Sequence, residues 1–240
     1  MSGHSKWSQI KRQKAKTDVK KGLTFTKLSN AIVIAIKQGG GITDPTQNFR
    51  LRLAVDSARS SNMPKENIER AIQKATGKEA GNMEEVIYEG FAPGGVSVIV
   101  EAATDNVQRT TSEIKNIFNK SGGSFGQPGS VSYQFSQLGK ITIDKDGKSY
   151  DEIFEAAVES GADDVEDADG EVAIYTSVSN LAKVKNDLSD KGFNITDARL
   201  WRKPNVKATV GDEEQLGKII NFIDTVNNLD DVQNVYSNLE

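Results

Sequence analysis

Hydrophobic positions in the first third of the chain recur at the spacing of an α-helix. Phe25, Leu28, Ile32 and Ile36 lie three or four residues apart, so they would share one face of a helix. The glycines at 39–41 follow directly, and glycine accepts the left-handed conformation that often follows a last helical turn. The pattern therefore predicts a helix that ends just before residue 39.

Two more helices are predicted before residue 80. Asp44, Pro45 and Gln47 form a capping pattern, which predicts a second helix running to about residue 60. Pro64 suits the start of a third helix, and Gly77 would follow its end. Because no alternating run of β-branched residues occurs before residue 85, we expect a basic leader and an all-helical domain in residues 1–80.

Strand-like patterns begin after residue 81. Segments 86–91 and 96–103 flank a Pro-Gly-Gly turn and predict a hairpin, with a helix behind it to about residue 120. Segments 131–135 and 140–143 predict a second hairpin. A Ser-x-x-Glu capping pattern at residue 149 predicts the next helix. Near the end of the chain, segment 207–210 is expected to form a short strand ahead of a last helix.

The order of these elements predicts that one α/β domain is inserted in another. Residues 131–203 contain nearly every element of a split α/β sandwich, whereas 82–130 supply only strand, strand and helix, and 204–240 supply the rest. The expected fold class is multidomain, α and α+β. It comprises an N-terminal helical domain (1–80), a discontinuous split α/β (ferredoxin-like) domain (82–130 and 204–240), and a second one inserted in it (131–203).

Charge is distributed unevenly along the chain. The 240 residues carry 30 Lys and Arg against 34 Asp and Glu, a net charge of −4. Residues 1–80 nevertheless hold 16 basic and 6 acidic side chains, which leaves 14 basic and 28 acidic ones for residues 81–240. A positive end on an acidic protein predicts a polyanionic partner, and nucleic acid is the simplest polyanion in a cell.

The basic leader carries the candidate nucleic-acid-binding residues. Its cations would contact phosphates, and Trp7 would stack on a base. Two alternatives stay open: Trp7 pins the leader to the helical domain, and the lysines form a solvated tail. A helix on a membrane surface is less favoured, because residues 6–21 contain few bulky apolar side chains. The candidates are Lys6, Trp7, Lys11, Arg12, Lys14, Lys16, Lys20, Lys21 and Lys27.

A second basic set lies on the later helices of the first domain. Arg50 and Arg52 are two residues apart and cannot share a helix face, so at least one of them is expected to serve the structure. The full set is Arg50, Arg52, Arg59, Lys65, Arg70 and Lys74.

The sequence offers little for catalysis or metal binding. It has no cysteine and one histidine, His4, which excludes disulfides and cysteine-based zinc sites. The glycine-rich segments miss the spacing of phosphate-binding loops, and the acidic stretch 163–171 does not match an EF-hand, so a solvated acidic rim is favoured. Without a signal peptide or a membrane span, we expect a soluble cytoplasmic protein that is no enzyme and binds no metal or cofactor.

Five motifs occur in order along the chain, and together they are far more specific than any single short pattern. They are GHSKW at 3–7, RLRLAVD at 50–56, NMPKENIERAI at 62–72, YEGFAPGGVSVIVEAATDN at 88–106 and SGGSFGQPGSVSYQF at 121–135. Together they resemble the YebC family of bacterial and organellar gene-expression regulators, and the resemblance covers essentially the whole chain.

The resemblance implies a cytoplasmic, non-enzymatic protein that binds nucleic acid. Some members of the family are catalogued as DNA-binding transcriptional regulators. Others act on the ribosome as translation factors that relieve stalling, and a mitochondrial relative activates translation. No helix-turn-helix pattern is evident, and a flexible basic leader suits an RNA channel, which favours the ribosome slightly. Both DNA and rRNA remain candidate targets, and the sequence does not predict the oligomeric state.

Overall fold

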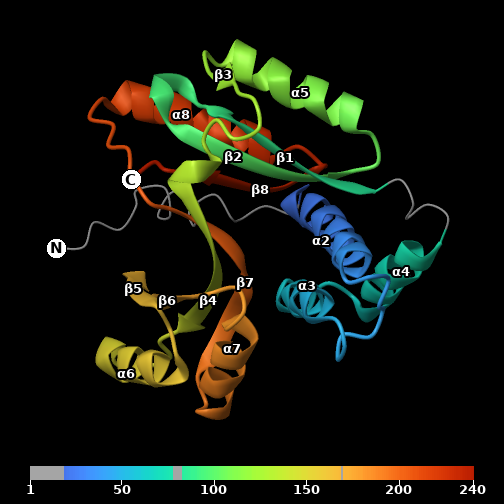
Figure 1. Ribbon diagram of the computed structural model, residues 1–240, viewed down its shortest axis with the longest axis vertical. Coiled ribbons are helices and arrows are strands. Elements are labelled where there is room, and N and C mark those ends of the chain that lie inside the picture. Colours follow the sequence, from blue (N-terminus) through green and yellow to red (C-terminus); the bar gives the residue numbers. More distant parts are fainter. Residues whose placement is uncertain (1–18, 78–82, 169) are drawn as a thin grey trace.

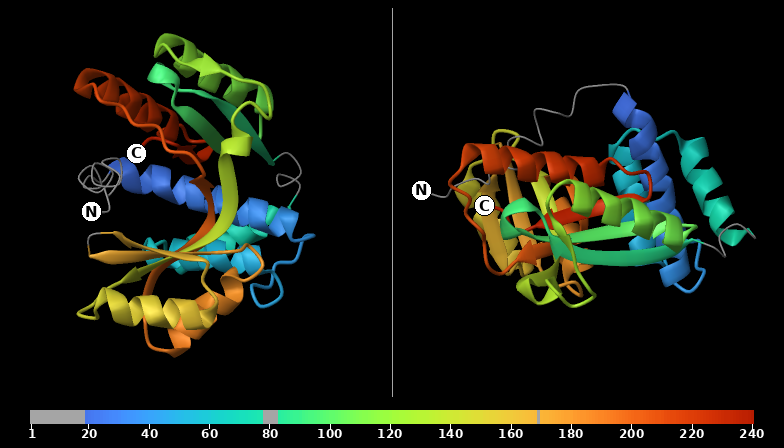
Figure 2. Two further views of the ribbon diagram at one scale, coloured as in Figure 1. Left: turned by 60° about the vertical axis from the view of Figure 1, so that its left-hand side comes forward. Right: turned by 90° about the horizontal axis from the view of Figure 1, so that it is seen from above.

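The computed structural model of the chain describes residues 19–77, 83–168 and 170–240, with side chains from residue 24 onward. Figure 1 shows a helical domain beside two α/β domains, an upper and a lower one. Each α/β domain is a four-stranded sheet with two helices on one face, and the helix-covered faces point away from each other (Figures 1 and 2). None of the helices in the described ranges is long and apolar enough to cross a membrane.

The helical domain consists of α2 (Val19–Gln38), α3 (Phe49–Ser60) and α4 (Lys65–Thr76). The predicted start of the second helix near Asp44 is wrong, because the cap is the buried Asn48. Its side chain accepts a hydrogen bond from the Leu51 amide at 3.1 Å and donates one to the Ala35 carbonyl at 3.0 Å. Asp44 instead accepts a hydrogen bond from the Thr46 amide at 2.8 Å and closes a turn before the helix.

The upper domain is built around aromatic side chains. Phe118 is fully buried, and its ring meets those of Phe125 and Phe222 edge-on, with centroids 5.6 and 4.8 Å apart. All strand pairs are antiparallel, in the order β3-β1-β2-β8. The elements are β1 (Glu84–Phe91), β2 (Ser97–Thr104), α5 (Val107–Lys120), β3 (Ser124–Phe125), α8 (Glu213–Asn227) and β8 (Val232–Ser237). The short 3₁₀ helix η2 (Pro93–Gly95) makes the predicted turn between β1 and β2.

The lower domain has an aliphatic core instead, which includes Ile141, Ile153, Ile174 and Leu181. Its strands follow the order β5-β6-β4-β7 and are also antiparallel. The elements are β4 (Phe135–Asp144), α6 (Tyr150–Ser160), β5 (Asp164–Ala168), β6 (Glu171–Thr176), α7 (Leu181–Asp190) and β7 (Asn194–Pro204). Helix α6 begins at the predicted capping box, which Ser149 forms with Glu152.

The predicted fold class is confirmed, including the insertion of one α/β domain in the other. The lower domain runs from β4 to β7 and lies in the chain between β3 and α8 of the upper domain. The predicted strand at 207–210 is wrong, because Ala208 makes only an isolated bridge to Leu239. The fourth strand of the upper sheet is β3, which precedes the insertion. The exact domain limits stay predictions.

The predicted hairpin at 131–143 is also wrong, since these residues form a 3₁₀ turn, η3 (Ser132–Gln134), and the single long strand β4. Gly139 lies between the two segments of the predicted hairpin but is inside this strand, paired with Leu200 and Thr176. A Cβ atom at Gly139 would come within 2.8 Å of the Leu181 side chain. The glycine therefore allows α7 to approach the sheet closely.

A buried carboxylate fixes the segment that leaves the upper domain. Glu89 on β1 accepts hydrogen bonds from the backbone amides of Gly129, Val131 and Ser132, each at 2.8 Å. Burial acts to raise the pKa of Glu89, but these three donors favour the charged form and hold the pKa below its ordinary value. The loop that leads into β4 is therefore held against β1 by one ionised side chain.

Candidate nucleic-acid interface

Most of the candidate residues of the basic leader lie outside the described part of the chain. This holds for Lys6, Trp7, Lys11, Arg12, Lys14 and Lys16. Lys20 and Lys21 belong to the first turns of α2, and their side chains are not among those described. Their assignment to nucleic-acid binding stays a prediction.

Lys27 is the one candidate whose side chain the structure describes, and it has a structural contact. Its Nζ donates a hydrogen bond to the backbone carbonyl of Asn227 at 2.5 Å, and the side chain is half-buried. Asn227 is the last residue of α8, where helix carbonyls lack partners and carry partial negative charge. Lys27 thus joins α2 to the upper domain, and a role in phosphate binding stays a prediction.

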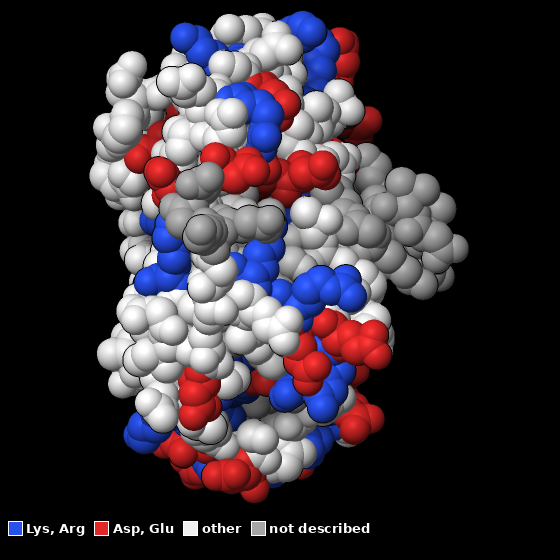
Figure 3. Space-filling model, turned by 90° about the vertical axis from the view of Figure 1, so that its right-hand side faces the viewer, with Lys and Arg blue, Asp and Glu red and all other residues white. Residues whose placement is uncertain are grey.

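Exposed cations gather on the helical domain. Figure 3 shows a band of Lys and Arg across the middle of the face over α2 to α4, with acidic groups above and below it. Two of these cations make long i,i+3 or i,i+4 pairs, Arg59 with Asp56 at 3.9 Å and Lys65 with Glu69 at 3.6 Å. Exposed pairs of this kind hold their cations weakly. Lys37 is also exposed, but its Nζ donates to the Met83 carbonyl at 2.6 Å. The exposed set is Lys37, Arg50, Arg59, Lys65, Arg70 and Lys74.

Arg70 and Lys74 are the best placed of this set to meet a polyanion. They lie four residues apart on α4 and therefore share one side of the helix. Both side chains are exposed, and within the described residues no ion pair joins either of them to a carboxylate. Two neighbouring cations on a rigid helix can contact successive phosphates of a nucleic-acid backbone.

Arg52 shows that a basic residue in this domain can be purely structural. Its Nε and Nη2 donate to the backbone carbonyls of Pro45 and Thr46, both at 2.9 Å, and so tie down the turn before α3. The prediction that Arg50 or Arg52 serves the structure is confirmed. Arg50 is exposed and contacts the side chain of Gln38.

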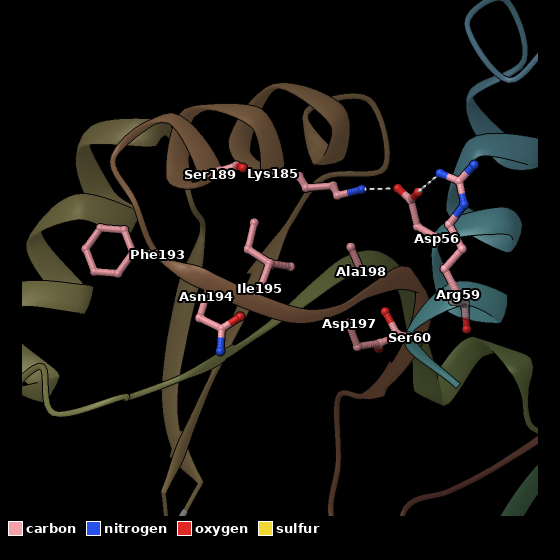
Figure 4. A pocket seen from close by; sticks show the side chains of 11 residues that line it. Asp56, Arg59, Ser60, Lys185, Ser189, Phe193, Asn194, Ile195, Asp197 and Ala198 are labelled. Carbon is pink, nitrogen blue, oxygen red and sulfur yellow. Dashed lines mark hydrogen bonds and ion pairs between the residues drawn. The ribbon is translucent and has the colours of Figure 1, made fainter. Parts of the chain in front are cut away.

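A groove of about 410 Å³ separates α3 from the lower domain (Figure 4). Asp56 of α3 accepts a hydrogen bond from Lys185 of α7 at 2.5 Å, and Arg59 lies on its other side. Asp197 of β7 adds a second carboxylate to the lining. Because two acids and two bases line it, the groove is not strongly positive. The ion pair between Lys185 and Asp56 joins the helical domain to the lower domain across it.

A second contact joins the upper and lower domains. Glu101 of β2 accepts hydrogen bonds from Arg202 of β7 at 2.7 Å and from the Tyr236 hydroxyl at 3.0 Å. Burial raises the pKa of Tyr236, and the adjacent Glu101 carboxylate raises it further, so the hydroxyl stays a donor. The rings of Trp201 and Tyr236 meet edge-on, 5.0 Å apart. Sequence analysis missed this junction, although Trp201 directly before the basic residues Arg202 and Lys203 on a strand was a usable signal.

The three domains are therefore held together by specific contacts of α2, α3, β2 and β7. The exposed band on α2 to α4 keeps a fixed orientation relative to the acidic domains. A polyanion bound on this band would meet a rigid surface, to which the leader is joined at the start of α2.

Family models match nearly the whole chain. The model described as TACO1/YebC protein N-terminal domain matches residues 5–78, and the model described as TACO1/YebC second and third domain matches residues 83–239. The junction between the two matches falls at the end of the helical domain, just before β1.

Individual proteins agree with this assignment. A probable transcriptional regulatory protein of Sulfurihydrogenibium sp. is 48% identical over 100% of this chain and 96% of its own length. One from Treponema denticola is 47% identical with the same coverage. The crystal structure of a conserved hypothetical protein from Aquifex aeolicus superposes with a TM-score of 0.91 at 44% identity, covering 98% of this chain and 97% of that one. The chain belongs to the TACO1/YebC family.

Proposed function

We propose that the protein is a cytoplasmic, non-catalytic regulator of gene expression that binds nucleic acid through the basic side chains of residues 1–80. The observation that carries the proposal is the band of exposed cations on α2 to α4, which lies beside two acidic domains. Cations on one rigid face attract a phosphate backbone, and the acidic remainder limits contact to that face.

The names of the relatives support regulation of transcription as the first process to test. Such binding would rest on phosphate contacts, because α4 exposes Glu66 and Glu69 among its cations and so presents no uniformly basic helix to a groove. The acids would be repelled by phosphates at close range. Binding should therefore be steeply salt-dependent and only weakly selective for sequence.

The test compares two pairs of charge reversals. Arg70→Glu with Lys74→Glu removes two exposed cations from the band, and Lys115→Glu with Lys120→Glu removes two exposed cations from α5 as a matched control. Binding of each variant to a labelled DNA duplex is measured by anisotropy from 50 to 200 mM salt. We expect the first pair to lower affinity and to flatten the salt slope by about 1 for each phosphate that the variant no longer binds. Equal decreases in affinity for both pairs would contradict the proposed surface.

The same variants separate DNA from RNA as the target. Full-length protein is sedimented with purified ribosomal particles and, separately, with the duplex. One outcome would identify rRNA as the target: the protein co-sediments with ribosomes and binds the duplex much less. This co-sedimentation should then be abolished by Arg70→Glu with Lys74→Glu, or by charge reversal of Lys11, Arg12 and Lys14. The function would then be that of a ribosome-associated translation factor.

A further inference from the structure

Helix α6 of the lower domain exposes an apolar stripe. Tyr150, Phe154 and Val158 are spaced by four residues and line one side of the helix. Phe154 and Val158 are 42% and 52% exposed, whereas Ile153 and Ala157 are fully buried in the core. Figure 1 shows α6 on the outer side of the lower sheet, away from the helical and upper domains. Phe154 and Val158 therefore lie largely outside the core, whereas Tyr150 packs partly against it.

An acidic row runs beside the stripe. Asp151, Glu155 and Glu159 each follow a stripe residue by one position and are exposed. Lys191 binds Glu159 at 2.7 Å, but within the described residues no ion pair joins Asp151 or Glu155 to a base. The helix contains no Lys or Arg. Its outer surface thus combines an apolar ridge with a parallel negative ridge.

The other flank of the stripe is the edge strand β5. The Tyr150 hydroxyl donates to the Val165 carbonyl at 3.2 Å, which holds the start of the stripe against this strand. The acids of β5 are largely neutralised, since Lys203 contacts Asp164 at 2.5 Å and Lys145 contacts Asp167 at 2.9 Å. Beside the stripe, Asp151 and Glu155 of the row are therefore exposed acids that no ion pair joins to a base among the described residues.

We propose that the stripe and the acidic row of α6 form a docking surface for a basic amphipathic helix of another protein. Parallel ridges at i,i+4 spacing accept a helix that carries an apolar ridge beside a Lys/Arg ridge, with the two helices packed ridge into groove. The acidic row repels nucleic acid, which excludes a phosphate backbone as the occupant. An antiparallel symmetric contact between two copies of α6 would place acid against acid.

The first experiment places the photo-crosslinking residue p-benzoylphenylalanine at Phe154 in the full chain inside living cells. The matched control carries it at Tyr133, which is 73% exposed on η3. We expect a light-dependent adduct from position 154 with a protein segment rich in Lys and Arg. Glu155→Lys in the same chain should reduce the adduct at least about tenfold, because like charges would then face each other. Glu113→Lys on α5 should leave it unchanged.

A second measurement uses a synthetic helical peptide with Leu at positions i, i+4 and i+8 and Lys one residue after each. We expect saturable binding that Glu155→Lys weakens about tenfold and Glu113→Lys does not, while a peptide with Glu in place of Lys fails to bind. Circular dichroism verifies that each variant is folded. If the chain with p-benzoylphenylalanine at Phe154 is not folded, the crosslinking residue is placed at Val158 instead. Adducts with nucleic acid, with a second copy of this chain or with a non-basic segment would overturn the proposal, as would insensitivity to Glu155→Lys.

Discussion

The upper and lower α/β domains share a plan but differ in what their corresponding helices present to solvent. The sheets have equivalent strand positions, with β3, β1, β2 and β8 matching β5, β6, β4 and β7. Helix α5 follows β2 and α6 follows β4, so the two helices also correspond. Yet α5 exposes both signs of charge, including Glu113, Lys115 and Lys120, whereas α6 exposes acids and an apolar stripe. One architecture thus carries two different surfaces.

The interiors differ as well as the surfaces. Three phenylalanine rings meet in the upper core, and the lower core is mainly Ile, Leu and Val. Aromatic rings bury more area per residue, and they leave larger cavities when truncated. The comparison teaches that the same layering tolerates different packing chemistry, provided that each sheet buries one face under two helices.

The largest effect is expected in the aromatic core. Phe118→Ala removes the ring between Phe125 and Phe222 and should lower the free energy of unfolding by about 3–5 kcal/mol. Urea denaturation followed by circular dichroism measures this decrease. A decrease confined to one of two separate transitions would show that the upper domain unfolds independently of the lower one. A decrease below about 1 kcal/mol would show that the rings are not a packed cluster.

An intermediate effect is expected where α7 lies against β4. Gly139→Ala places a Cβ within 2.8 Å of Leu181, so the helix must shift, at a cost of about 1–3 kcal/mol. Gly211→Ala serves as the control, because no atom lies within 4 Å of its Cβ position. Thermal unfolding of both variants provides the comparison. Equal melting temperatures for the two would contradict the packing role assigned to Gly139.

The smallest effect is expected at Glu89. Glu89→Gln leaves one side-chain oxygen for three amide donors, which should cost about 1 kcal/mol near neutral pH. Because the folded pKa is depressed, the contribution of the carboxylate is fully present above its unfolded pKa of about 4.3 and is lost as the pH falls through the folded pKa. The difference from the unmodified protein should therefore close in acid.

Urea denaturation between pH 7 and pH 3 measures this change, with Glu113→Gln on the exposed side of α5 as the control. A difference that is constant with pH would show that the charge of Glu89 contributes nothing to the fold.

Capping chemistry and element order were enough to predict most of the fold. Ser149 and Glu152 begin α6 as expected, and the sequence of strands and helices predicted the insertion. The hairpin error at 131–143 has a physical cause. A glycine or a short polar stretch signals a turn only if nothing packs on it, and Gly139 is required by Leu181, which lies more than forty positions away. Local sequence patterns do not predict such contacts between residues that are far apart in the chain.

The candidate interface was harder to predict than the fold. Positive charge predicted a basic surface on the helical domain, but it did not distinguish Lys27 and Arg52, which bind backbone carbonyls, from exposed cations such as Arg70. A cation's role depends on which carbonyl or carboxylate the fold brings to it. The contact of Glu101 with Arg202 was missed for the same reason.

The insertion has a consequence for how the chain reaches this structure. In the upper sheet β2 pairs with β8, with Val98 opposite Ser237, so the sheet closes only after the whole insert has been made. The lower domain brings its own ends together, because Phe135 at the start of β4 pairs with Pro204 at the end of β7. Once folded, it shortens the loop between β2 and β8 by about half, which lowers the entropy cost of closing the upper sheet by roughly 0.6 kcal/mol.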